Sequence, residues 1–149
     1  MTMTSIENNH LKAFVDTNVI IDAFTQRDYS YGGSISFLRQ IIKGSVTGYI
    51  CDKQITDLYY VLKKYVNDES VRRKMITSIT NTFEILPLLK SDVLACLNTD
   101  MNDLEDAILD EVAKVNVIPY FVTNNVKDFK NSKVPAITPE QFLTMFQLN

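Results

Sequence analysis

The sequence predicts an α/β fold in which helices cover both faces of a mostly parallel sheet. Short runs of β-forming residues alternate with longer segments whose apolar residues recur at helical spacing. Strands that alternate with helices are joined by crossovers, which place the helices on the faces of a parallel sheet. The 149 residues contain no repeat, low-complexity tract or linker, which predicts a single domain at 12–149 after a flexible tail at 1–11.

The first half of the domain contains two strands, and helical segments follow each of them. Val46 to Cys51 alternates and is rich in β-formers, and Gly44 just before it is a typical residue for the end of a helix. The elements predicted here are a strand at 12–16, a helix at 18–24, a turn-rich segment at 27–33, a helix at 34–43, a strand at 46–51, a helix from 52 or 53 to 66 and a helix at 69–81.

The second half repeats this alternation with shorter strands. Pro87 ends the third strand, and Pro139 suits the first position of the last helix. The elements predicted here are a strand at 82–86, a helix at 91–97, a helix at 103–115, a strand at 119–122, an edge strand at 134–137 and a helix from 139 to 146.

Composition limits the chemistry that the chain can perform. Two cysteines without a CxxC pair are too few for a disulfide framework and indicate a reducing, cytoplasmic environment. The single histidine, His10, lies in the tail, so a histidine-based zinc site or a Ser-His-Asp triad has no partner residue. Any metal must therefore be held by oxygen ligands. No apolar run approaches the roughly 20 residues that span a bilayer, and we expect no membrane association.

The net charge of −3 lacks the basic surplus typical of nucleic-acid-binding domains. It does not exclude such a function, because carboxylates gathered in a metal site lower the net charge without covering the surface.

Several polar residues are expected at one edge of the sheet. Asp16 leaves the first strand and Asn125 follows the fourth, and the carboxyl ends of parallel strands share an edge. Asp103, Asp106 and Asp110 fall at i, i+3 and i+7 and share one face of a helix. Two interpretations stay open for this face: it is solvated, or Asp106 faces the pocket that Asp16 lines.

Carboxylates gathered in one pocket favour a hard divalent cation such as Mg²⁺ or Mn²⁺, whose ligands are oxygen atoms. Such an ion activates water and offsets charge on phosphorus, so phosphodiester hydrolysis is the natural chemistry of an all-acid site. A phospho-accepting receiver domain also has an acidic pocket, but it requires an aspartate at the end of the third strand. Here that strand ends in Leu86 and Pro87, which excludes this class.

Four segments, in order and spread over nearly the whole chain, resemble the PIN domain family. Within that family they are most similar to the VapC-like ribonucleases of toxin–antitoxin systems and their stand-alone relatives. The four segments are FVDTNVIID at 14–22, QITDLYYVL at 54–62, DLEDA at 103–107, and VTNNVKDF at 122–129 followed by VPAITPEQFL at 134–143.

The resemblance implies a three-layer α/β/α fold with a central, mainly parallel sheet of about five strands. It also implies a Mg²⁺- or Mn²⁺-dependent endoribonuclease that hydrolyses RNA phosphodiesters and acts as the toxin of a toxin–antitoxin pair. The implied partners are an RNA substrate, a small antitoxin protein and a second copy of the chain in a homodimer.

The resemblance also implies the roles of individual residues. The metal-binding and catalytic acids are Asp16, Asp57 and Asp106. The accessory residues are Thr17, Asn18, Asp103 and Asn125. Thr17 and Asn18 would orient Asp16 or its water, whereas Asp103 would be an accessory ligand or a group behind the ligands. Periodicity alone assigns Asp57 to the surface, because it lies off the apolar stripe of its helix.

Three positions depart from the family pattern. Asp57 stands where glutamate is usual, Asn125 where aspartate is usual, and Asn124 where arginine is often found. These departures predict at most one well-bound metal, and they keep open an alternative, a catalytically weakened module that binds RNA or a partner protein. Asp128 is expected to brace its turn, and Asp22 to lie on a helix side near the rim of the pocket.

Overall fold

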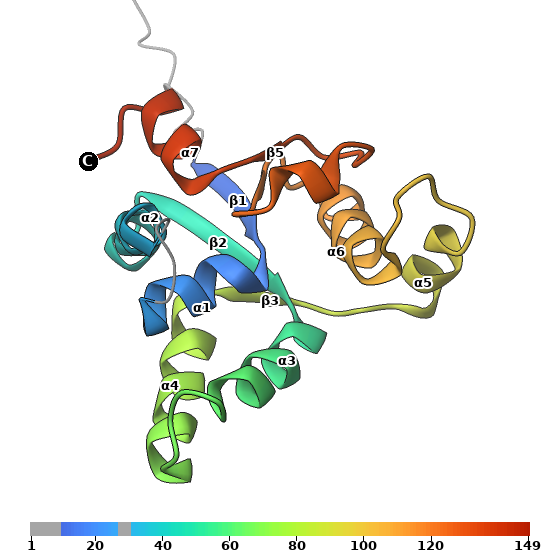
Figure 1. The fold of residues 1–149 in the computed structure, drawn as a ribbon. Helices are drawn as coiled ribbons and strands as arrows, with labels where there is room; N and C mark the ends of the chain where they lie inside the picture. The colour runs from blue at the N-terminus through green and yellow to red at the C-terminus, as the bar shows by residue number, and fades with distance from the viewer. Residues whose placement is uncertain (1–9, 27–30) are drawn as a thin grey trace, which may run out of the picture.

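The computed structural model describes residues 10–26 and 31–149, which form five parallel strands with helices on both sides (Figure 1). The strands lie in the order β3-β2-β1-β4-β5. They are β1 (Leu11–Val15), β2 (Val46–Cys51), β3 (Glu84–Leu86), β4 (Phe121–Val122) and β5 (Ala136–Ile137). The helices of the described residues are α1 (Thr17–Thr25), α2 (Tyr31–Lys43), α3 (Asp52–Leu62), α4 (Glu69–Thr82), α5 (Lys90–Cys96), α6 (Leu104–Val115), α7 (Pro139–Met145) and the short 3₁₀ helix η1 (Val126–Phe129).

Strand β1 is the centre of the sheet. It pairs with β2, where Leu11 lies opposite Val46, and with β4, where Phe14 lies opposite Phe121. The rings of Phe14 and Phe121 stack with their centroids 5.3 Å apart. Since every pairing is parallel, the carboxyl ends of all five strands open on one edge of the sheet.

Each face of the sheet has its own apolar core, which confirms the predicted three-layer α/β/α fold. On one face, Ala13 and Val15 of β1 pack with buried residues of α1, α2, α3, α4 and α7. On the other face, Phe14 packs with buried residues of α5 and α6. Neighbouring residues of β1 thus serve opposite cores, as the two-residue period of a strand requires.

The helix α2 begins earlier than predicted. Of the turn predicted at 27–33, residues 27–30 lie outside the described residues, and residues 31–33 form the first turn of α2. Glycine disfavours a helix by about 1 kcal/mol, but Gly33 has a packing role here. The Glu140 side chain of α7 occupies the space that a Cβ atom on Gly33 would fill.

The helix α3 ends at Leu62, four residues before its predicted end. Backbone bonds from Lys64 to Val61 and from Tyr65 to Leu62 tighten the chain into a turn beyond the helix. Asp68 then caps α4 by accepting bonds from the backbone of Ser70, so the chain has to leave the α3 direction before that point.

At the amino terminus, β1 begins at Leu11, and residues 1–9 of the predicted tail lie outside the described residues. In the ranges that the structure covers, no helix has the length and apolar character needed to cross a membrane.

Candidate functional site

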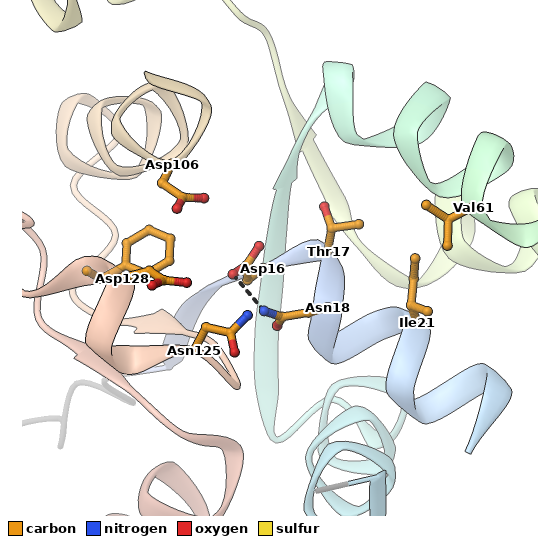
Figure 2. Close-up of a pocket in the computed structure, with 9 residues that line it drawn as sticks. Asp16, Thr17, Asn18, Ile21, Val61, Asp106, Asn125 and Asp128 are labelled. Atoms are coloured by element: carbon orange, nitrogen blue, oxygen red, sulfur yellow. Dashed lines mark hydrogen bonds between the residues drawn. The ribbon is translucent and has the colours of Figure 1, made fainter. Parts of the chain in front are cut away.

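A cavity of about 230 Å³ opens at the carboxyl edge of the sheet, between the β1–α1 junction, the start of α6 and η1 (Figure 2). Its wall combines carboxylates, amides and a few apolar side chains. The lining residues are Asp16, Thr17, Asn18, Ile21, Val61, Asp106, Asn125, Asp128 and Phe129. Two of the predicted acids, Asp16 and Asp106, therefore meet in one pocket although they are far apart in the chain.

Asp16 is held rigidly where β1 becomes α1. It is the N-cap residue of α1, and only 7 % of its surface is exposed. Its Oδ2 atom accepts hydrogen bonds from Thr123 Oγ1 at 2.8 Å and from Asn18 Nδ2 at 3.2 Å (Figure 2 draws the second). Asn18 therefore orients the Asp16 carboxylate directly, and Thr123 at the end of β4 adds a contact that the sequence did not indicate.

Gln54 stabilises the β1–α1 junction through hydrogen bonds, and it was not predicted as part of the site. Its fully buried amide donates to the Val15 carbonyl at 3.0 Å and to Thr17 Oγ1 at 3.1 Å. Its Oε1 atom accepts from the Cys51 backbone at 2.7 Å. Thr17 thus lines the pocket but bonds to Gln54, and Gln54 ties the ends of β1 and β2 together. A glutamine on the first turn of an amphipathic helix was the available signal.

Asp106 enters the pocket from the first turn of α6. Asp103 is the N-cap of this helix, and its Oδ1 atom accepts from the Asp106 backbone at 3.0 Å. Figure 2 shows the Asp106 and Asp128 carboxylates directed toward the same space as Asp16. Asp103 acts here as a cap that fixes the start of α6, and it does not line this cavity.

The electrostatics of the pocket favour neutralisation of its acids. Burial, partly offset by the hydrogen bond from Thr123, raises the pKa of Asp16 from 3.8 to about 6. Burial, together with the negative charges of Asp16, Asp103 and Asp128, raises the pKa of Asp106 from 3.8 to about 7. Neither acid forms an ion pair with a cationic side chain of residues 10–26 or 31–149, so no positive charge there offsets the two carboxylates at close range.

The donor set fits a hard divalent cation. In the part of the chain that the structure describes, no three histidine, cysteine, aspartate or glutamate side chains are arranged to hold a metal ion by themselves. Mg²⁺ commonly takes one or two protein carboxylates and completes its shell with water and substrate phosphate. Asp16 and Asp106 supply two carboxylates, and the Asn125 amide in the same lining supplies a further oxygen donor.

The structure does not bring Asp57 into this lining. Its carboxylate lies 2.9 Å from Lys53 Nζ, one turn earlier on α3, and 42 % of its side chain is exposed. Lys53 also contacts Glu105 of α6 at 3.0 Å, so one lysine joins an acid of α3 to an acid of α6.

Asp128 lies in the pocket instead of only bracing its turn. Its backbone N–H donates to the Asn125 carbonyl at 3.0 Å, which closes the turn as expected, while its side chain lines the cavity. In a 3₁₀ helix, residues three apart lie on the same side. The spacing between Asn125 and Asp128 was therefore a signal that could have identified this acid.

The interpretation of Asp110 as part of a solvated acidic face is wrong. Only 3 % of this residue is exposed, and its two carboxylate oxygens accept from the backbone N–H groups of Lys133 at 2.9 Å and Val134 at 3.0 Å. The helical period places Asp110 beside Asp106, but the segment before β5 folds over it. Asp110 therefore fastens that segment to α6.

Asp22 was expected near the rim of the pocket, but it is buried, with only 2 % of its surface exposed. Its Oδ2 atom accepts from Asn124 Nδ2 at 2.7 Å, and the same amide group lies 3.1 Å from Ser34 Oγ. Asn124 also donates its backbone N–H to Asn18 Oδ1 at 3.2 Å. Asn124, which replaces the arginine often found there, thus connects the end of β4 to α1 and α2.

Comparison with known proteins places these features in a family. A family model described as "PIN domain" matches residues 12–127. Ribonuclease VapC1 from Aquifex aeolicus (strain VF5) is 30 % identical over 139 residues, which cover 90 % of this chain and 94 % of that protein.

Solved structures of other proteins share the fold. VapBC2 from Rickettsia felis, bound to a DNA fragment from its promoter, superposes with a TM-score of 0.63 at 17 % identity and covers 86 % of this chain and 98 % of its own. A toxin–antitoxin complex from Klebsiella pneumoniae superposes with a TM-score of 0.60 at 23 % identity and covers 85 % and 97 %.

Proposed function

The chain belongs to the PIN domain family, and from that premise we propose that it is a metal-dependent endoribonuclease, the toxin of a toxin–antitoxin pair. The observation that carries the proposal is the meeting of Asp16 and Asp106 in one polar cavity, where both carboxylates have raised pKa values. The Aquifex aeolicus relative, which matches nearly the whole chain, is itself named a ribonuclease.

Asp16 and Asp106 are the residues that would hold Mg²⁺ or Mn²⁺. When bound, the ion supplies a water of lowered pKa and offsets the charge that develops on the phosphate. Asn18 and Thr123 keep the Asp16 carboxylate in one orientation through bonds of 3.2 and 2.8 Å. The Asn125 amide lies in the same lining and can donate to a phosphate oxygen, a role that a carboxylate at this position could not fill.

Asp57 is proposed as the second acid on its family position alone. Its carboxylate is bound to Lys53 outside the lining of the cavity, so it would act from the rim and through water. We therefore expect Asp57→Asn to lose less activity than Asp16→Asn.

The test is cleavage of single-stranded RNA in the presence of Mn²⁺. Asp16→Asn and Asp106→Asn should each slow cleavage by about 100-fold or more, because metal-assisted stabilisation of the transition state is worth several kcal/mol. Glu84→Gln is the matched control, since it removes one exposed carboxylate from β3, away from the cavity. Equal cleavage by the wild type and Asp16→Asn would contradict the proposal.

A second candidate function is RNA or protein binding without efficient cleavage. Asn125 in place of an acid, together with the Lys53–Asp57 ion pair, favours this alternative. If the wild-type protein binds RNA but does not cleave it in the presence of Mn²⁺, this second function is the correct one.

The proposed partners, apart from RNA, are a small antitoxin protein and a second copy of this chain, and the proposed location is the cytoplasm. The support for an antitoxin comes from relatives whose structures were solved as toxin–antitoxin complexes. Co-expression with the adjoining short reading frame, followed by size-exclusion chromatography, would test both protein partners. If the chain elutes as a monomer with no second protein bound, both proposed protein partners are contradicted.

A further inference from the structure

A second hollow of about 290 Å³ adjoins the acidic cavity, and the two share the side chains of Asp106 and Asp128. It extends from the cavity toward the far end of η1 and the loop before α6. Its remaining wall carries Asp103 and two lysines, Lys127 and Lys130. The two hollows are therefore neighbours, and a ligand with several phosphates that enters the acidic cavity is long enough to reach the second hollow as well.

The two lysines are available for a ligand. Both are exposed on or directly after η1, and neither forms an ion pair within residues 10–26 and 31–149. They are three residues apart, so the 3₁₀ geometry places them on the same side of the turn. Their ammonium groups are three-donor cations suited to phosphate oxygens.

The opposite flank of the acidic cavity differs. On that flank, the ammonium group of Lys53 already contacts Asp57 at 2.9 Å and Glu105 at 3.0 Å. A phosphate arriving on that flank would have to compete with two carboxylates. The two flanks are therefore unequal, and of these lysines the ones that form no ion pair with another described residue, Lys127 and Lys130, lie on the η1 side.

We infer that the second hollow is the subsite for the RNA phosphates next to the scissile one, and that Lys127 and Lys130 bind them. The inference rests on the proposed function, since it assumes that the scissile phosphate lies between Asp16 and Asp106. A polyanion is repelled by the acids of the cavity, and cations on one flank offset that repulsion and fix the direction of the strand. The lysines line the adjoining hollow and not the acidic cavity itself, so they are binding residues and not catalytic residues.

The first experiment measures kcat and KM for cleavage of a single-stranded RNA with Mn²⁺ at 50 to 200 mM KCl. The test variant is Lys127→Gln/Lys130→Gln, and the matched control is Lys43→Gln/Lys74→Gln, which removes two exposed lysines from α2 and α4. The test variant should raise KM and leave kcat within about twofold, because the two lysines bind the ground state and the transition state equally well. The slope of log KM against log salt should fall by about 0.7 for each phosphate that a lysine no longer binds. Between 50 and 200 mM KCl, this difference in slope changes the KM ratio of the wild type and the variant by about 2.6-fold.

The second experiment locates the bound phosphate on the RNA. Neutral methylphosphonate linkages are placed one at a time on each side of the mapped cleavage bond. One linkage on a single side should raise KM for the wild type and for Lys127→Arg/Lys130→Arg, yet leave KM of the glutamine variant unchanged. Equal KM values and salt slopes for the test variant and the control would overturn the inference while the cleavage assignment stands.

If the wild type cleaves no RNA, the proposed function fails, and the subsite is still decided by binding. Fluorescence anisotropy with a labelled single-stranded RNA would then compare the same two double variants. Weaker binding by the test variant alone supports the subsite, and equal binding by both overturns it.

Discussion

The buried Asp16 carboxylate should make the metal-free protein less stable as the pH rises. Its pKa is about 6 in the folded chain, against 3.8 for an ordinary aspartate. A raised pKa means that the Asp16 carboxyl stays protonated to a higher pH in the folded state than in the unfolded state. The stabilisation that this proton gives to the folded state is therefore complete below about pH 4 and is lost as the pH rises through 6. The difference between the two pKa values corresponds to a total change of about 3 kcal/mol in the free energy of unfolding. About 2 kcal/mol of this stability is lost between pH 4.5 and pH 8.

The replacement Asp16→Asn removes this titration but keeps an oxygen that can accept from Thr123. The stability of the variant relative to the wild type should therefore rise by about 2 kcal/mol between pH 4.5 and pH 8. Urea unfolding in EDTA at the two pH values measures it, and the comparison between pH values cancels the cost of any hydrogen bond that the amide fails to form. Glu84→Gln, on the exposed side of β3, should change its relative stability by less than about 0.5 kcal/mol.

Divalent metal provides a second readout of the same prediction. Mn²⁺ at 100 times its Kd should stabilise the wild type by about 2.7 kcal/mol at pH 8 and leave Asp16→Asn unchanged. A relative stability of Asp16→Asn that is flat or falls with pH would refute the reasoning, because it would mean that the folded chain already compensates the charge.

Two further substitutions test neighbouring parts of the site. Asp110→Asn should lower the free energy of unfolding, measured with urea, by about 2 to 4 kcal/mol. The amide NH₂ would face one of the two backbone N–H groups that now donate to the carboxylate. A loss below about 1 kcal/mol would contradict this prediction. Asn125→Asp adds a carboxylate beside Asp16 and should increase the rise in Tm caused by 1 mM Mn²⁺ while lowering Tm in EDTA at pH 8; an unchanged response to Mn²⁺ would show that position 125 is out of reach of the metal.

The fold and half of the site follow from local patterns in the sequence. The alternation of strands and helices predicts the parallel sheet, and a parallel sheet brings Asp16 and Asn125 to one edge. The predictions of the sheet and of its edge succeed because they depend only on the strand and helix periods and on the direction of the strands. The helix period puts Asp106 on the first turn of α6 but leaves open whether that face meets solvent or the pocket, and the structure places its side chain in the lining of the cavity.

The remaining assignments depend on contacts between distant segments. Asp110 has the same helical phase as an exposed residue, and only the fold of the segment at 133–134 over α6 buries it. Asn124 is an ordinary loop residue in the sequence, yet its amide reaches Asp22 across 102 residues. Periodicity carries no information about which loop covers a helix face, so Asp110 was interpreted as part of a solvated face and the contact of Asn124 was not foreseen.

Asp57 is where family position and geometry differ, and Lys53 explains the difference. The family position makes Asp57 the second acid, but its carboxylate is held by a lysine one turn away that also holds Glu105 on α6. Burial lowers the pKa of Lys53, but the hydrogen bonds with Asp57 and Glu105 outweigh it and raise that pKa above its usual value. The ion pair therefore persists through neutral pH and competes with any cation for Asp57. The third acid in the described lining of the cavity is Asp128. The negative charge of the site is therefore displaced from α3 toward η1, the side on which Lys127 and Lys130 lie without an ion pair to any other described residue.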